Sequence, residues 1–145
     1  MTHRVETVMA AVVTAVTGLT TTGANVNRGN PYNIESSKLP CLHVEMGTES
    51  KVQEYAHGEA DWDLEVKVTG TVRDIDNYEQ LINTIREEVH IALRTDYTLG
   101  ETFIIDIEEA DPDEYIIDGV AEKPTAEQGW NWVVRYRRNI DNPSI

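Results

Sequence analysis

The chain has 145 residues, of which 40% are hydrophobic, and this excludes intrinsic disorder and fits one folded domain. Its 26 acidic and 12 basic residues give a formal net charge of −14, which argues against a protein that grips the phosphate backbone of nucleic acid. A single cysteine excludes an intramolecular disulfide. No apolar run approaches the roughly 20 residues that cross a bilayer, so we expect a soluble protein.

The first predicted element is an amphipathic helix over residues 3–17. Its apolar residues recur every three or four positions and therefore share one face. Polar residues such as Glu6 interrupt the run, which argues against a secretory signal. Because many of its residues are β-branched, we expect the helix to depend on packing against a sheet.

Short strands are predicted next. Residues 26–28 fit a strand, and residues 29–31 (Gly-Asn-Pro) fit a turn. Residues 41–46 alternate between two faces, which predicts a half-buried strand. The residues expected to face one way are Leu42, Val44 and Met46, and those expected to face the other way are Cys41, His43 and Glu45.

Residues 47–60 are polar and have no clear period, so we expect a long loop or a mobile hairpin there. Residues 61–68 alternate strictly between apolar and charged residues, which predicts a strand with one face open to water. A second helix is predicted from Asp76 or Asn77 through residue 93. Asp76 and Glu79 resemble a capping box, and a regular apolar stripe follows.

Further strands are predicted at residues 103–109, 114–118 and 129–137. The order of elements favours a single domain over residues 1–145 of the α/β (α+β) class. In it, two amphipathic helices pack on one face of a mixed, mainly antiparallel sheet. Such a sheet has edges and an exposed face that must be hidden or charged.

The sequence contains no recognisable catalytic motif: G-x-S-x-G, the Walker loop, G-x-G-x-x-G and C-x-x-C are absent. His43 and Glu45 form an H-x-E pair, but zinc deaminases place that pair on a helix and add P-C-x-x-C. The four histidines are scattered, without metal-ligand spacing. We therefore expect no catalytic residue, no cofactor, no metal site and no enzymatic activity.

The acidic run over residues 108–114 is the one candidate for a cation site. Its carboxylates are suitable ligands for Ca²⁺ or Mg²⁺, but the spacing and the glycine of an EF-hand are missing. A solvated acidic loop is the simpler interpretation, and the sequence leaves the choice open. The acidic residues are Glu108, Glu109, Asp111, Asp113 and Glu114.

Charge is distributed unevenly near the C-terminus. Residues 101–127 hold ten acids and one base, a net of −9, whereas residues 128–145 hold three bases and one acid, a net of +2. Opposite charges could face one another across strands of a single subunit. Alternatively, the basic edge of one subunit could meet the acidic edge of the next, and such head-to-tail contacts can close into a ring.

Several short motifs follow one another in a specific order. With the two predicted helices, they resemble the tail terminator proteins of long non-contractile-tailed phages, a family that includes the phage lambda tail terminator (minor tail protein U type). The similarity extends over nearly the whole chain, and the order of the motifs carries it. The motifs are N-R-G-N-P-Y at 27–32, L-P-C-L-H-V at 39–44, D-L-E-V-K-V-T-G at 63–70, G-V-A-E-K-P at 119–124 and W-V-V-R-Y-R at 132–137.

The resemblance implies a phage structural protein that caps the tail tube as a hexameric ring and ends tube polymerisation. The ring would then form the head-facing joining surface, with DNA passing through it during ejection. Implied partners are further copies of the chain, the tail tube protein and a head–tail connector protein, with no membrane and no cofactor. The implied location is the head-proximal end of the virion tail, after assembly in the host bacterial cytoplasm.

Two groups of residues are predicted to form interfaces. The polar segment 47–60 is expected to contact the tube or a neighbouring subunit, because long loops in compact domains commonly have a function. The arginines near the C-terminus are expected to form a basic edge. The predicted interface residues are Glu49, Ser50, Lys51, Val52, Gln53, Glu54, Tyr55, Arg135, Arg137 and Arg138.

Other functions remain open at this point. The chain could be another head–tail connector or tail completion protein, a small carboxylate-using enzyme, or a generic binding module. An enzyme would need a cleft that holds two carboxyl groups with strongly shifted pKa values.

Overall fold

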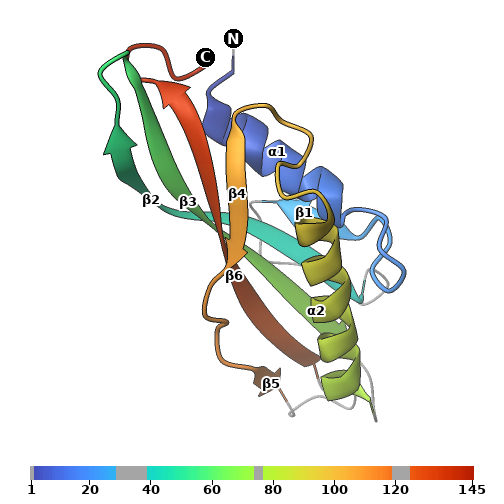
Figure 1. The fold of residues 1–145 in the computed structure, drawn as a ribbon. Coiled ribbons are helices and arrows are strands. Elements are labelled where there is room, and N and C mark those ends of the chain that lie inside the picture. Colours follow the sequence, from blue (N-terminus) through green and yellow to red (C-terminus); the bar gives the residue numbers. More distant parts are fainter. Residues whose placement is uncertain (1, 29–38, 74–76, 119–124) are drawn as a thin grey trace.

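A computed structural model describes residues 2–28, 39–73, 77–118 and 125–145 of the chain (Figure 1). It contains two helices and a mixed sheet of six strands, which confirms the predicted α+β class. The elements are α1 (Arg4–Val16), β1 (Val26–Arg28), β2 (Cys41–Glu54), β3 (Glu59–Arg73), α2 (Tyr78–Thr95), β4 (Ile104–Glu109), β5 (Ile116–Asp118) and β6 (Thr125–Asn139).

The three longest strands, β2, β3 and β6, form the middle of the sheet. The strand order is β1-β2-β3-β6-β4, and β5 also pairs with β6. Only β1 and β2 run parallel, while the other described pairs are antiparallel. β6 is thus flanked by β3 on one side and by β4 and β5, one after the other, on its other side.

Both helices bury their apolar stripes in one core against one face of the sheet. Alternate residues of β2, β3 and β6 contribute the sheet's side of that core, as the two-residue period requires. The described residues include no helix that is long and apolar enough to span a membrane. The buried helical residues are Val8, Met9, Val12 and Val16 of α1, and Ile82, Ile85, Val89 and Leu93 of α2.

The long loop predicted over residues 47–60 is wrong: the segment is mostly strand. β2 continues to Glu54, β3 begins at Glu59, and Tyr55 donates its backbone N–H to the Glu59 carbonyl at 2.8 Å to close a β-hairpin. The hairpin alternative therefore describes the backbone correctly. The apolar period is missing because every residue of β2 from Glu45 to Glu54 is exposed, so no buried face selects apolar residues.

The prediction for residues 41–46 is also partly wrong. Met46, which was expected on the same face as two core residues, is 58% exposed. Cys41 and His43, expected on the open face, are buried. Burial thus changes along β2 from its first four residues, which are covered on both faces, to its last ten, which are exposed. The turn predicted at 29–31, and Asp76 of the predicted capping box, lie outside the described residues.

Gly70 of β3 provides a stability prediction, because the ring of Trp130 lies directly against its backbone. A Cβ at this position would lie 2.5 Å from Trp130 Cη2. We expect Gly70→Ala to lower the free energy of unfolding by about 2 kcal/mol, since neither the buried ring nor the strand can move freely. Urea denaturation measures this, with Gly47→Ala as the control.

The control position lies in the exposed half of β2, where a Cβ would approach the flexible Glu65 side chain and its carbonyl at 3.1 Å. Its expected cost is below about 1 kcal/mol. Equal losses in the two variants would contradict the packing of Trp130 over Gly70.

Candidate functional site

The ten predicted interface residues lie together in one part of the sheet, which we call the arm. It consists of residues 49–55, 59–64 and 134–139, aligned by the β2–β3 and β3–β6 pairing. The hairpin of β2 and β3 extends away from α2, on the same side of the molecule as both chain termini (Figure 1). Ile140 donates its backbone N–H to the Gly58 carbonyl at 2.8 Å, which attaches the C-terminal segment to the tip of the hairpin.

One face of the arm is built around a buried carboxylate. Asp61 is 5% exposed, and Arg137 donates to its two oxygens at 2.7 and 3.2 Å. Tyr55 donates its hydroxyl to Asp61 at 2.7 Å, and the Arg137 guanidinium lies 4.6 Å from the centre of the Tyr55 ring. The Arg137 hydrogen bonds hold the pKa of Asp61 below its usual range, whereas the hydrogen bond to Asp61 raises the pKa of Tyr55.

The opposite face of the arm places an aromatic ring among charged side chains. The guanidinium of Arg138 lies 4.2 Å from the centre of the Trp62 ring, and the ammonium of Lys51 lies 5.8 Å from it. The buried Tyr136 donates its hydroxyl to Glu49, which also lies 3.7 Å from Arg138. Burial raises the pKa of Tyr136, and the Glu49 acceptor adds to this shift. These contacts connect all three strands.

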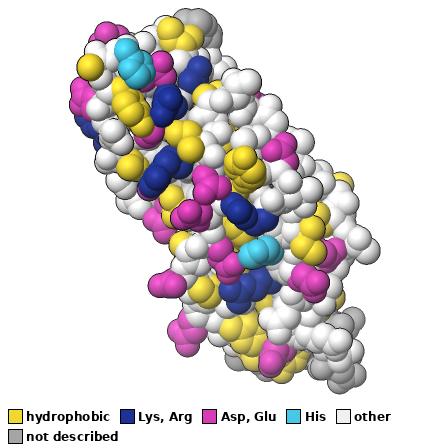
Figure 2. Space-filling view, in the orientation of Figure 1, with side chains coloured by type: hydrophobic (Ala, Val, Ile, Leu, Met, Phe, Trp, Pro, Cys, Tyr) yellow, Lys and Arg dark blue, Asp and Glu magenta, His cyan; other side chains and the backbone are white. Residues whose placement is uncertain are grey.

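Each of the three predicted interface arginines has a carboxylate partner in its own chain. Arg135 forms a bidentate pair with Asp63 at 2.9 and 3.1 Å. The pairing of opposite charges within one subunit therefore holds for these arginines, with acids from β2 and β3 rather than from residues 101–127. Figure 2 likewise shows basic side chains lying among acidic ones on the face in view. For the arginines to bind a neighbouring subunit, they would have to exchange these partners.

The outer edge of β2 is open along the arm and over the residues just before it. β1 pairs with residues 42–44 only, so residues 46–54 have no neighbouring strand on that side within the described chain. Two apolar side chains are exposed along this stretch, Met46 at 58% and Val52 at 44%. A strand edge with free N–H and C=O groups is a template for pairing with another chain. Charged neighbours, including the Lys51–Glu54 pair at 3.2 Å, limit which chains can approach.

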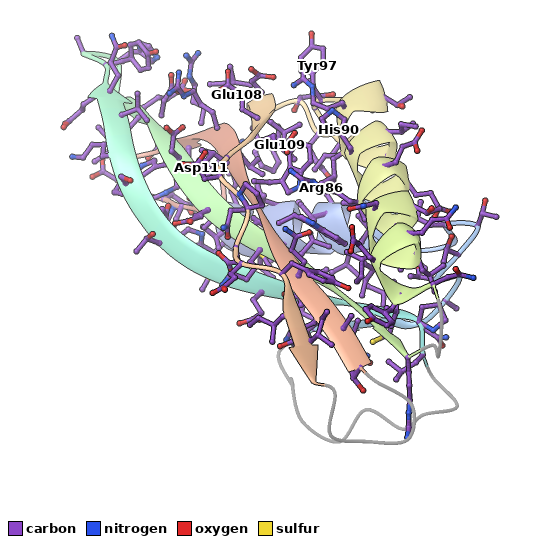
Figure 3. The ribbon with its side chains drawn as sticks, turned by 90° about the horizontal axis from the view of Figure 1, so that it is seen from below. Arg86, His90, Tyr97, Glu108, Glu109 and Asp111 are labelled. Carbon is purple, nitrogen blue, oxygen red and sulfur yellow. The ribbon has the colours of Figure 1, made fainter. Side chains whose placement is uncertain are left out.

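The acidic run over residues 108–114 does not converge on one point. Figure 3 shows Arg86 and His90 of α2 directed toward Glu109, whereas Asp111 lies farther from the helix. Arg86 Nη2 lies 2.9 Å from one oxygen of Glu109, and His90 Nδ1 lies 3.0 Å from the other. Both oxygens of Glu109 are therefore engaged in joining α2 to β4.

Asp113, from the same run, is engaged elsewhere. Lys67 Nζ lies 2.7 Å from one of its oxygens, and the Asn131 amide donates to the other at 3.0 Å. These two groups lower the pKa of Asp113, with Lys67 as the larger cause. Across the described ranges, no three His, Cys, Asp or Glu side chains lie close enough together to hold a metal ion.

Sequence reasoning missed three residues of the arm: Asp61, Trp62 and Tyr136. Their alternation places them in strands, but it does not reveal that Asp61 is buried or that Arg138 and Lys51 lie against the Trp62 ring. One sequence feature could have indicated this arrangement. Two acids two residues apart, 61 and 63, lie opposite two arginines two residues apart, 137 and 135, on the neighbouring antiparallel strand.

Comparison of the sequence with protein-family models and with curated protein sequences gave no match.

Proposed function

We propose that this chain is the repeating subunit of a ring that caps a phage tail tube. The ring ends polymerisation of the tube protein and forms the surface that joins the head, with DNA passing through it as cargo. It would belong to the head-proximal end of the virion tail, and the chain would have no enzymatic role. The free edge of β2 carries this proposal, together with the motif order that resembles tail terminators.

The free edge supports self-assembly because it exposes backbone groups and the apolar Val52 on an arm whose arginines are already paired within the chain. When a surface of this kind meets a different surface of the next copy, the contact is head-to-tail, and repeated rotation can close a ring. A ring of six is the size that the resemblance implies.

The charge balance supports the passage of DNA without binding. With 26 acids and 12 bases per chain, a ring multiplies the excess of negative charge. The arginines of the arm are engaged by Asp61, Asp63 and Glu49, and five further Lys or Arg side chains are in ion pairs, which leaves few cations among the described residues for phosphate contacts. Such a surface repels the DNA backbone, as a channel that must not hold DNA requires.

The direct test adds the purified chain to tail tubes that lack a terminator and examines them by negative-stain microscopy. We expect density at one end only, and we expect capped tubes to stop elongating when free tube protein is supplied. Binding to a head connector but not to tubes would favour the connector alternative. A monomer that binds neither would contradict the proposal and favour a generic binding module.

The enzyme alternative gains no support from two carboxyl groups whose pKa is lowered, one in the arm and one in the segment between β4 and β5. Asp61 and Asp113 are held in separate ion pairs with Arg137 and Lys67. An enzyme of the expected kind needs two carboxyls in one cleft.

A further inference from the structure

The face of the sheet away from the helices contains a hollow that the proposed function does not use. The cavity measures about 260 Å³ and lies over β2, β3 and β6, with one wall from the segment between β4 and β5. Its middle row consists of His43, Thr69 and Gly129, which are paired across the three strands. Side-chain size decreases along this row, from the imidazole of His43 to the smaller Thr69 and then to Gly129, which has no side chain.

Gly129 keeps the hollow open. A Cβ at this position would lie 2.8 Å from Asp113 Oδ2 and 3.1 Å from Lys67 Cδ. Because Gly129 has no side chain, the Lys67–Asp113 ion pair can lie directly over its backbone, at one side of the cavity. Because the Asp113 backbone N–H also donates to the Gly129 carbonyl at 2.8 Å, this wall is held in place.

His43 is the unusual member of the lining. It is 4% exposed, and neither of its ring nitrogens has a hydrogen-bond partner among the described residues. Its nearest acidic oxygen belongs to Glu45, 3.7 Å from Nε2. Buried imidazole nitrogens are normally hydrogen-bonded, since a buried polar atom without a partner gives up its hydration and gains nothing in return. An arriving donor would supply a partner for the acceptor nitrogen of the neutral imidazole.

The charges around the hollow determine what kind of donor fits. Lys67 and Asp113 neutralise each other, and their contact raises the pKa of Lys67. Three further carboxylates line the cavity without a Lys or Arg partner among the described residues, and they are Glu45, Glu114 and Glu127. The site is therefore rich in acceptors and carries net negative charge.

We propose that this hollow binds an organic cation with N–H donors, a guanidinium or primary ammonium group, through Glu45 and His43. The volume lies below the roughly 300–1,000 Å³ of pockets that enclose drug-sized ligands, so it suits one side chain or a short amine. A metal ion is a poorer fit, because no three ligating side chains converge among the described residues.

Binding requires a small rearrangement. The ring nitrogens of His43 are covered, whereas the Glu45 side chain is 46% exposed. Turning of Glu45 toward the cation gives one donor access to the carboxylate and a second donor access to the imidazole. A guanidinium, with five donors in a fixed plane, can serve both at once.

The experiment titrates the intact chain with agmatine, a free guanidinium amine, and separately with acetyl-Gly-Arg-Gly-amide, while NMR follows the His43 ring signals. We expect saturable binding and a shift of the His43 signals. Glu45→Gln should weaken binding about tenfold or more, because it removes a charge-assisted hydrogen bond. Glu54→Gln changes the net charge equally on the exposed arm and should leave binding unchanged.

The two titrants distinguish the sources of the cation. Tighter binding of the peptide indicates an arginine of a partner protein, whereas tighter binding of agmatine indicates a free small amine. The proposal is overturned if neither titrant saturates below about 10 mM, or if both variants lose affinity equally. The inference does not depend on ring formation, so failure of tube capping would leave it intact.

Discussion

Replacing Arg137 with methionine is expected to lower the free energy of unfolding by about 3 kcal/mol at neutral pH. The change leaves Asp61, whose side chain is 8% exposed, without its cation. Breaking a buried ion pair by removing one partner costs about 3–5 kcal/mol. We expect the lower end because the Arg137 side chain is itself 38% exposed. Chemical denaturation of the two proteins measures the difference.

The matched control is Arg135→Met, two residues away on the same strand. Arg135 also forms a bidentate pair, but its side chain is 45% exposed and that of its partner, Asp63, is 27% exposed. Solvent screens such a pair, so the expected loss is below about 1 kcal/mol. Similar losses in the two variants would show that burial of Asp61 has no energetic role.

The loss of unfolding free energy caused by Arg137→Met should become smaller as the pH falls. Arg137 lowers the pKa of Asp61, so the stabilisation is fully present above the unfolded pKa of about 3.9. It is lost as the pH falls through the lower, folded pKa, because the protonated carboxyl no longer gains from the cation. The difference in stability between wild type and variant should therefore shrink below about pH 4. A difference that grows on acidification would contradict the assignment.

Val52→Glu is expected to prevent assembly without unfolding the subunit. Val52 is 44% exposed and lies at the register irregularity of β2, so its replacement disturbs little within the chain. In a ring joined through the β2 edge, the same carboxylate would be buried without a cation. That penalty should weaken self-association by roughly 100-fold or more. Sedimentation velocity and tube capping are the two readouts.

Ile91→Glu is the control, because Ile91 is 56% exposed on α2 and the substitution adds the same charge. It should leave both assembly and capping unchanged. If the two variants assemble equally well, the β2 edge is not the interface. If both fail to assemble, the loss reflects added negative charge rather than this edge.

The parts of the fold that the sequence predicts are those where burial selects residue types. Residues 61–68 alternate because one face is core, and the stripe of α2 repeats because Ile82, Ile85 and Val89 are buried. The outer half of β2 lacks any such signal, since its residues are exposed on both faces. Its strand conformation comes from pairing with β3, a long-range property that no local pattern records.

The candidate site shows a similar division. Sequence alone selects residues 49–55 and the arginines as interface residues, but by two separate arguments, about length and about charge. The two groups lie close together in the structure because β3 pairs with β2 on one side and with β6 on the other. Nor does the sequence reveal that His43 is buried, because its alternation with core residues predicts an exposed face.

The mass of the purified chain in solution tests the central claim most directly. Sedimentation equilibrium over a wide concentration range should detect a closed assembly, and for the hexamer that the resemblance implies the mass is six times 16.3 kDa, about 98 kDa. A single species of 16.3 kDa at every concentration, and in the presence of tail tubes, would contradict the account.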